Sequence, residues 1–226
     1  MEPRWLFNIL KPNVLLVVAN PDDETIFAGG LILCSRRTHW TIICCTTEYG
    51  QRQHEFLDAC KFLAKESGNR IDPIVLGLRD SQIDLGELAR KLRPYTSWYD
   101  IVITHNKEGE YGHKYHKLVH RYVVDVIRNP NTWVFISPGS TNVNQERLKS
   151  KIPGGNFLLS LPPKIRRLKI RAFQECHASQ ASLYGYDKTG KLRNTDLRDT
   201  LYWYFENPAR EEYTFHKQIA HDFPHF

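Results

Sequence analysis

Two short segments of the sequence concentrate the side chains that could do metal or acid–base chemistry. Asp22 and Asp23 stand together in the first, and His113 and His116 lie in the second, with His120 one turn further on. On a helix beginning near His113, these three histidines fall at i, i+3 and i+7 and share one face. Imidazole nitrogens facing a carboxylate, with one position open for water, form the donor set that a divalent transition metal prefers. The two segments therefore predict a metal site.

Both segments also allow a purely structural interpretation. Asp22 and Asp23 could cap the following helix and favour its positive end. His113 or His116 could make ordinary hydrogen bonds at a helix N-terminus. Two further histidines are interpreted as structural side chains and not as ligands: His105 and His120.

The pattern of apolar residues predicts the scaffold that would bring the two segments together. Apolar, β-branched runs alternate with helix-like segments through the first 140 residues, which is typical of βαβ units building a parallel sheet. The predicted strands are Asn13–Ala19, Trp40–Thr46, Pro73–Leu78, Asp100–His105, Thr132–Ser137 and Asn156–Leu161. The predicted helices are Glu24–Arg37, Gln53–Lys65, Leu85–Leu92, His113–Arg128 and Lys164–Leu183. We predict an α/β fold, a Rossmann-like three-layer sandwich with a mostly parallel central sheet, in one domain over residues 1–226.

The two chemical segments follow the first and fourth predicted strands. In a doubly wound sheet, ligands bind beyond the carboxyl ends of these strands, where the strand order reverses. A dinucleotide site would need a glycine-rich first turn there. Three acidic side chains, Asp22, Asp23 and Glu24, occupy that turn instead. They would repel phosphate and attract a cation, so the sequence argues against a nicotinamide or flavin enzyme.

The first predicted strand is followed by the motif Pro-Asp-Asp-Glu, and later in the chain stands the motif Gly-Glu-Tyr-Gly-His-x-x-His. These two motifs resemble the paired signature of the PIG-L/LmbE family of zinc-dependent N-acetylglucosaminyl deacetylases. The likeness covers residues 13 to about 181. It includes three secondary matches: Phe27-Ala28-Gly29-Gly30, Leu76-Gly77-Leu78-Arg79-Asp80, and Lys169 with His177-Ala178-Ser179-Gln180. Residues 185–226 match no motif, and their aromatic side chains are predicted to shape the substrate pocket.

The resemblance implies a metal-dependent deacetylase that removes an N-acyl group from an N-acetylated amino sugar or its conjugate. It implies that Asp22 is the general base and that Asp23 and His116 bind Zn2+. His113 would be the protonated partner near the leaving amine, and Tyr111 would donate to the tetrahedral oxyanion. These roles agree with the general chemistry of metal-assisted amide hydrolysis.

One position departs from the family pattern. The first metal ligand of the family is the histidine of His-Pro-Asp-Asp, and this chain has Asn20 there. Its amide offers only a weak neutral oxygen, so we expect Asn20 to be a poor third donor and zinc affinity to fall. Three explanations stay open: an enzyme with a weaker or alternative divalent metal, an inactive glycan or nucleotide-sugar binding protein, or an introduced substitution. The retained Asp22, Tyr111, His113 and His116 favour hydrolysis.

Residues that could bind the substrate follow the second and third predicted strands or lie on a late basic helix. That helix could face an anionic substrate, or it could be a solvated surface. Its basic residues are Lys164, Arg166, Arg167, Lys169 and Arg171. Loop positions near a site often contact ligands. The predicted substrate-binding residues are Arg52, Asp80 and Lys169.

The composition limits the class of protein. At 226 residues and 41% hydrophobic content, the chain can bury one sizeable core. It contains no apolar run near the roughly 18 residues of a spanning helix and no signal-peptide pattern, so we expect a cytoplasmic protein without a transmembrane segment. The five cysteines lack metal-ligand spacing and are expected to be reduced thiols.

The formal charge of +6 fits an anionic partner but also fits many ordinary enzymes. A binding protein for glycans or nucleic acid is the rival interpretation. The chain has no RNA- or DNA-binding motif, so we expect a small-molecule substrate and no nucleic acid. The sequence does not fix the oligomeric state.

Overall fold

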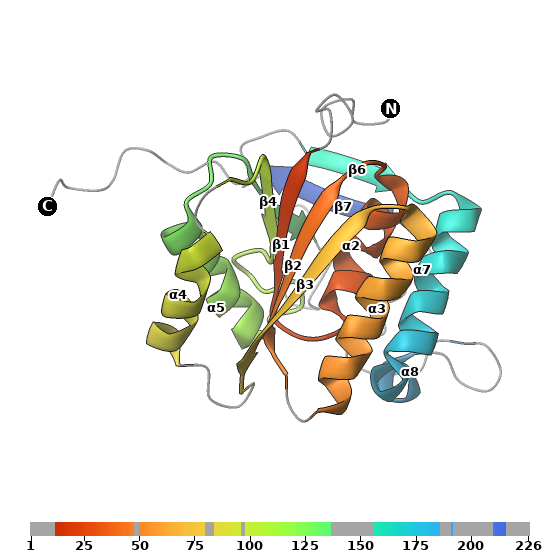
Figure 1. Ribbon diagram of the computed structural model, residues 1–226, viewed down its shortest axis with the longest axis horizontal. Helices are drawn as coiled ribbons and strands as arrows, with labels where there is room; N and C mark the ends of the chain where they lie inside the picture. The colour runs from red at the N-terminus through yellow and green to blue at the C-terminus, as the bar shows by residue number, and fades with distance from the viewer. Residues whose placement is uncertain are drawn as a thin grey trace, which may run out of the picture.

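The computed structural model describes residues 12–47, 50–79, 84–95, 98–136, 156–185, 191 and 210–215. Its centre is a sheet with the strand order β3-β2-β1-β4-β5-β7-β6 (Figure 1). The first five strands in that order pair in parallel, and β7 pairs antiparallel with β5 and β6. The strands are β1 (Asn13–Val18), β2 (His39–Thr46), β3 (Arg70–Leu78), β4 (Ile101–Thr104), β5 (Thr132–Ile136), β6 (Asn156–Ser160) and β7 (Arg210–Phe215).

Helices cover both faces of the sheet, as Figure 1 shows. One face carries α2 (Asp23–Cys34), α3 (Gln51–Ser67), α7 (Pro163–Cys176) and α8 (Ala178–Tyr184). The other carries α4 (Leu85–Leu92), the short helix η2 (Arg93–Tyr95), α5 (Lys114–Tyr122) and the π-helical turn η3 (Val123–Ile127). The predicted α/β sandwich with a mostly parallel central sheet is confirmed.

The central strand β1 shows why the sequence folds in this way. Val14 and Leu16 pack into the core beneath α2 and α3, whereas Leu15 and Val17 pack into the core beneath α4 and α5. All four side chains are fully buried. A strand covered on both faces must be apolar throughout, which is typical of parallel sheets between helical layers. This packing fixes the end of β1, where the first chemical segment begins.

The predicted elements of the first 136 residues are present with ends shifted by up to three residues, except that the helix predicted over His113–Arg128 is α5 followed by the π-helical turn η3. Beyond them, two differences appear. The single basic helix predicted over Lys164–Leu183 is two helices, interrupted at His177, where φ is −107° and ψ is 50°. Strand β7 was not predicted, and it lies in the aromatic region expected to shape a pocket. The remainder of that region is almost entirely outside the described residues, and the single-domain assignment stays a prediction.

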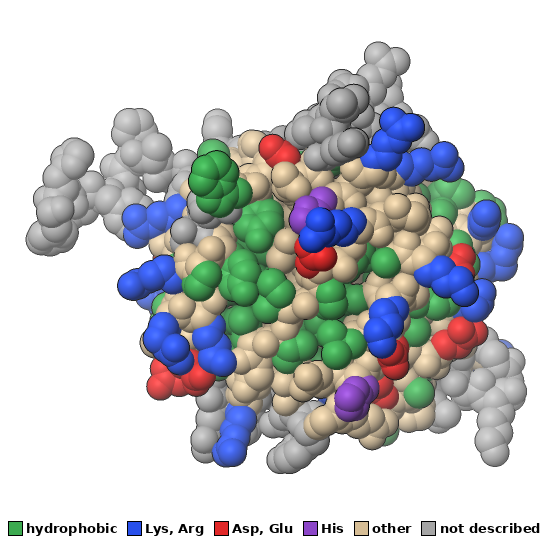
Figure 2. Space-filling model, viewed as in Figure 1, with side chains coloured by type: hydrophobic (Ala, Val, Ile, Leu, Met, Phe, Trp, Pro, Cys, Tyr) green, Lys and Arg blue, Asp and Glu red, His purple; other side chains and the backbone are tan. Residues whose placement is uncertain are grey.

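Figure 2 shows apolar side chains gathered around the edge strand β3, between α4 and α3, with Lys and Arg side chains on both flanks and a few near the middle of this face. Among the described helices, none is both long and apolar enough to cross a bilayer. All five cysteines are free thiols, and Cys44, Cys45 and Cys60 are buried.

Candidate metal centre and active site

The carboxyl ends of β1 and β4 lie side by side. The two strands are parallel neighbours in which Val17 stands opposite Thr104. The strand order reverses between them, so the chain leaves both strands into the crevice where ligands of doubly wound sheets bind. The two chemical segments therefore meet at the predicted edge of the sheet.

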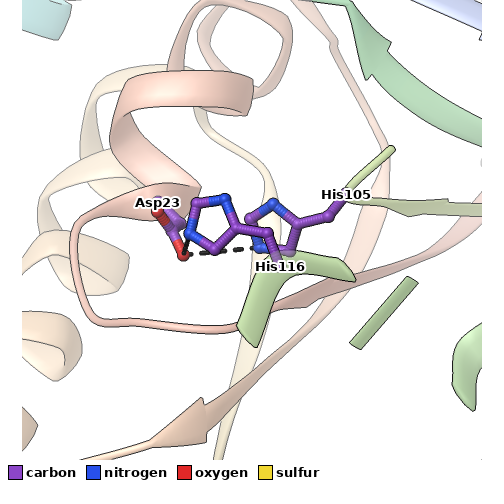
Figure 3. Close-up of side chains that lie close together, drawn as sticks. All are labelled: Asp23, His105 and His116. Carbon is purple, nitrogen blue, oxygen red and sulfur yellow. Dashed lines mark ion pairs between the residues drawn. The ribbon is translucent and has the colours of Figure 1, made fainter. Parts of the chain in front are cut away.

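Asp23, His105 and His116 each place one possible ligand atom within 4.8 Å of the others (Figure 3). Asp23 begins α2, His105 follows β4, and His116 lies in the first turn of α5. The distance from Asp23 Oδ2 to Nε2 is 3.4 Å for each histidine. One carboxylate and two imidazoles in a buried group form a donor set that suits zinc.

Glu110 lies behind the two histidines and contacts both. Its Oε2 accepts from Nδ1 of His105 at 2.8 Å and from Nδ1 of His116 at 2.5 Å. Its Oε1 accepts from the backbone N–H of Asn106. Burial opposes ionisation, but the two histidines outweigh it and lower the pKa of Glu110 to about 2. The carboxylate thus holds both rings with Nδ1 protonated and turns each Nε2 toward Asp23.

His116 meets the requirement for an ion ligand. Its Nε2 is buried and has no hydrogen-bond partner among the described residues. Buried polar atoms are nearly always satisfied, so an unsatisfied one calls for an explanation. Glu110 orients the ring of His116 so that the lone pair of Nε2 faces the Asp23 carboxylate. A divalent ion could bind between these two groups, and the residues present therefore fit a metal.

His105 is placed differently, because its Nε2 already accepts the backbone N–H of Ala19 at 2.9 Å. Burial opposes protonation of His105, whereas the carboxylates of Glu110 and Asp23 favour it and act to raise the pKa of the ring. The hydrogen bond from Ala19 decides the state in this structure, because a proton on Nε2 would point directly at the Ala19 N–H, so we assign a neutral ring that donates through Nδ1. His105 could bind an ion only by giving up its hydrogen bond with Ala19.

The side chain of Asn20 is held by Thr46, at the end of β2. The hydroxyl of Thr46 donates its single proton to the carbonyl of Ala19, so Thr46 must accept from Nδ2 of Asn20, at 2.9 Å. This contact leaves the Asn20 carbonyl oxygen as the one side-chain atom able to meet a cation. The backbone N–H of Asn20 also donates to Asp23 Oδ2 at 2.7 Å.

Asp22 occupies a strained backbone position beside this group. Its φ is 110°, and its side chain makes no capping hydrogen bond to α2. Strain of this kind costs about 1–3 kcal/mol and gathers at functional sites. Burial raises the pKa of Asp22 to about 8, with Arg52 opposing and Asp23 reinforcing the shift. The simple capping interpretation therefore does not describe this carboxylate.

Tyr111 and His113 are half-buried in the loop before α5. The ring centroid of His116 lies 5.3 Å from that of Tyr111 and 4.4 Å from that of His113. Both side chains thus lie at the edge of the buried group, whereas His120 is buried and its Nδ1 contacts the carbonyl of His105. The structure thus gathers both predicted residues around His116.

The three predicted substrate residues lie in different places. Arg52, in the first turn of α3, donates to the carbonyl of Pro21 and pairs with Asp22 Oδ1 at 3.4 Å. Lys169 is fully buried, with its stem near Gly29 of α2. Asp80 lies outside the described residues. Substrate contact by each of them stays a prediction.

Sequence reasoning did not assign Glu110, although it stands inside the Gly-Glu-Tyr-Gly-His motif. An acidic residue close to a candidate histidine ligand is a signal for an orienting carboxylate. His105 was interpreted from the sequence as a structural side chain, whereas the structure places it beside Asp23 and His116. Thr46 carried no signal, because an ordinary strand residue does not reveal which side chain it will hold.

A Rossmann-like sandwich with a buried Asp-His-His group at its switch point defines the class: an α/β protein with a candidate metal centre. The chain belongs to the PIG-L family, whose sequence model, described as GlcNAc-PI de-N-acetylase, matches residues 15–127. The match runs from β1 to the end of η3 and includes both chemical segments. The resemblance read from the two motifs is confirmed.

Two relatives align with part of the chain. Uncharacterized protein L374 of Acanthamoeba polyphaga mimivirus is 26% identical over 151 residues, covering 58% of this chain and 64% of that protein. The 1D-myo-inositol 2-acetamido-2-deoxy-alpha-D-glucopyranoside deacetylase of Segniliparus rotundus is 29% identical over 166 residues, covering 52% of this chain and 51% of the enzyme. The alignments thus span between half and two thirds of these relatives.

Solved structures share the fold at low identity. A conserved protein of Thermus thermophilus superposes with a TM-score of 0.59 at 16% identity, covering 95% of this chain and all of the other. The zinc-inhibited form of teicoplanin deacetylase Orf2 superposes with a TM-score of 0.59 at 13% identity, covering 91% of this chain and 99% of that one. The 4-carboxy-2-hydroxymuconate hydratase of Pseudomonas putida superposes with a TM-score of 0.51 at 16% identity, covering 76% of this chain and 81% of that one. At these identities the likeness shows the fold alone.

Proposed function

We propose that this protein is a metal-dependent N-deacetylase acting on an N-acetylated amino sugar or its conjugate. One observation carries the proposal: Asp23 and His116 converge at 3.4 Å, and His116 Nε2 is buried without a hydrogen-bond partner in the part of the chain that the structure describes. Membership of the PIG-L family and the similarity to a deacetylase of a 2-acetamido sugar support the reaction and the substrate class. The likeness to one hydratase bears on the fold and not on the chemistry.

Asp23 and His116 would hold the ion, for which zinc is the first candidate. Two side chains could supply a third donor, the Asn20 carbonyl oxygen and His105 Nε2. Each has a cost, because the amide oxygen is a weak ligand for zinc and His105 would lose its hydrogen bond with Ala19. When bound, a divalent ion supplies Lewis acidity that polarises the amide carbonyl and lowers the pKa of water.

Asp22 is the proposed general base. A base works best when its pKa lies near the working pH, and burial raises the pKa of Asp22 to about 8. Arg52 holds the carboxylate from one side, which leaves the other oxygen to receive a proton from water. The backbone of Asp22 is strained at φ 110°, as is common for residues that act in a functional site.

His113 and Tyr111 are proposed to act on the substrate. His113, at the start of α5, would give a proton to the leaving nitrogen. Tyr111 would donate a hydrogen bond to the oxyanion that develops from the amide oxygen. Their half-buried positions at the edge of the centre suit groups that must meet a substrate.

A sugar-binding protein of the same fold is the second candidate. The observation that favours it is Asn20, which stands where the family has a histidine. In that case the crevice would bind an N-acetylated sugar without cleaving it. Binding without release of amine would distinguish this candidate from the enzyme.

The test measures metal content by elemental analysis and amine release from N-acetylglucosamine and its inositol-linked form. The protein is stripped with chelator and reloaded with zinc, cobalt or manganese. We expect metal-dependent amine release that falls about 100-fold or more in Asp22→Asn, with metal content unchanged. Bound metal without amine release from any substrate would favour the binding protein, and absence of metal binding would refute the proposed centre.

A further inference from the structure

His177 lies at the junction of α7 and α8, far from the candidate metal centre in sequence but connected to it by hydrogen bonds. Its side chain is fully buried. Nε2 lies 2.7 Å from Glu24 Oε1, and Nδ1 finds no hydrogen-bond partner within the described ranges of the chain. The contacts of Nε2 with Glu24 and, at 3.2 Å, with the hydroxyl of Thr25 therefore set the orientation of the ring. The family-like segment His177-Ala178-Ser179-Gln180 begins here, and the proposed chemistry gives it no role.

Glu24 transmits this contact to Asp22. Its Oε1 accepts hydrogen bonds from Nε2 of His177 and from the hydroxyl of Thr25, and its Oε2 accepts one from the backbone N–H of Asp22 at 3.1 Å. Asp22 is the residue with φ 110°. A side chain that accepts the amide proton of a strained residue favours that backbone conformation, because relaxation would leave the buried N–H unpaired.

Ser179 makes a second connection to the same place. Its backbone N–H and its hydroxyl donate to the two oxygens of Glu55, at 2.9 and 2.6 Å. Glu55 lies one turn after Arg52 on α3, and Arg52 contacts both Pro21 and Asp22. The α7–α8 junction thus reaches Asp22 through two buried carboxylates on two different helices.

We propose that His177 and Ser179 form a positioning device for Asp22, in which His177 acts through Glu24 on the Asp22 backbone and Ser179 acts through Glu55 on the helix turn that carries Arg52. The device is needed because Asp22 sits on a turn that would otherwise relax. A displacement of about 1 Å in a reacting group can cost on the order of 100-fold in rate. The role of Asp22 as general base rests on the proposed function, whereas the effect on its backbone does not.

Two amide substitutions at position 177 separate the hydrogen bond from simple packing. Glutamine places its NH2 group near the position of the histidine Nε2, so His177→Gln keeps a donor for Glu24. Asparagine is shorter and places the same group near the position of Nδ1, so His177→Asn loses that donor. Ser182→Ala is the control, since Ser182 is exposed on α8 and its hydroxyl donates to the carbonyl of Ser179. Thr25→Val removes the other donor to the same Glu24 oxygen and is the milder variant if His177→Asn does not fold.

The experiment combines amide hydrogen exchange over residues 20–26, zinc content, and kcat and KM for amine release from N-acetylglucosamine. In His177→Asn we expect faster exchange of the Asp22 amide and a kcat lower by about 10- to 100-fold, with KM and zinc per protein unchanged. Thr25→Val should change in the same direction by less. His177→Gln and Ser182→Ala should stay within about 3-fold of the unsubstituted protein, a free-energy difference below about 1 kcal/mol.

Two results would overturn the proposal. One is a folded His177→Asn protein whose Asp22 amide exchange and kcat equal those of the unsubstituted protein. The other is an equal loss of kcat, zinc content and thermal stability in His177→Asn and His177→Gln. If no variant, including the unsubstituted protein, releases amine, the proposed function fails. The exchange of the Asp22 amide would then still decide whether the device holds the backbone.

Discussion

We expect Asn20 to limit how tightly the candidate centre binds zinc, because its amide offers one weak oxygen while Thr46 holds the nitrogen. Structural zinc sites with four strong ligands bind zinc with a free energy of about 10–16 kcal/mol. Divided among the ligands, this makes one additional strong ligand worth on the order of 100-fold in affinity. We expect Asn20→His to raise zinc affinity by about that factor and to raise amine release. Chelator competition measures the affinity.

Asn20→Ala is the companion variant, since it removes the oxygen without supplying a nitrogen. It should bind zinc more weakly than the unsubstituted protein if Asn20 is a ligand. Equal zinc affinity in all three proteins would show that position 20 does not contact the ion and would leave His105 as the third donor.

Glu110 should control metal binding without touching the ion. It holds the Nδ1 protons of His105 and His116, and carboxylates in this position typically contribute 10- to 100-fold to metal affinity. Glu110→Gln is expected to weaken zinc binding by about that factor, because the amide NH2 would face either both ring N–H groups or the backbone N–H of Asn106. Competition with a coloured chelator provides the measurement.

Glu108→Gln is the matched control for this prediction. Glu108 lies in the same loop, is half-buried, and contacts Asn106 through its backbone N–H. Its substitution changes the same charge but leaves both histidines oriented. A similar loss of zinc affinity in the two variants would mean that charge alone, and not the hydrogen bonds of Glu110, explains the effect.

At the scale of elements, the loop between β4 and α5 must turn sharply to bring His116 beneath β1. Gly109 has φ +69°, and a Cβ there would lie 2.4 Å from the carbonyl oxygen of His113. We expect Gly109→Ala to displace the start of α5, to lower the free energy of unfolding by about 1–3 kcal/mol and to weaken zinc binding. Urea unfolding and zinc titration check both effects.

Gly112→Ala provides the comparison within the same loop. Its φ is +95°, but a Cβ there would meet no atom of the described residues within 4 Å. It should show the cost of backbone strain without the clash, and zinc binding should survive. If the two alanine variants lose zinc affinity equally, then contact with the His113 carbonyl does not position α5.

At the scale of the whole molecule, stability should depend on pH through His177. Burial opposes its charged form, but Glu24, followed by Asp22 and Glu55, raises its pKa above the ordinary value of 6.5. The folded protein then holds the proton more tightly than the unfolded chain. This contribution is complete below about pH 6.5 and is lost as the pH rises through the folded pKa.

We therefore expect the free energy of unfolding, measured with urea and excess chelator, to fall more steeply above about pH 6.5 in the unsubstituted protein than in His177→Gln. The difference between the two proteins isolates His177 from other groups that titrate in this range. Parallel pH profiles would show that the buried pair with Glu24 does not favour the protonated histidine.

The sequence by itself determined the framework of the molecule and the pair of segments that carry its chemistry. Runs such as Val14–Val18 are apolar at every position because both faces of β1 are covered, and alternation of such runs with helical segments indicates a parallel sheet. Once the strands were placed, topology alone set the segments after β1 and β4 side by side. The family motifs added the deacetylase expectation.

Only the tertiary structure decided which atom each polar side chain meets. Ala19 and His105 are 86 residues apart, and Glu24 and His177 are 153 apart; no local period reports such contacts, because periodicity reflects only the geometry of neighbouring residues. The helix break at His177 was not predicted for the same reason, since the side chain of His177 contacts Glu24, which is distant in sequence. Whether a lone pair faces a backbone N–H or an ion depends on placement within about an ångström, which spacing along a chain cannot specify.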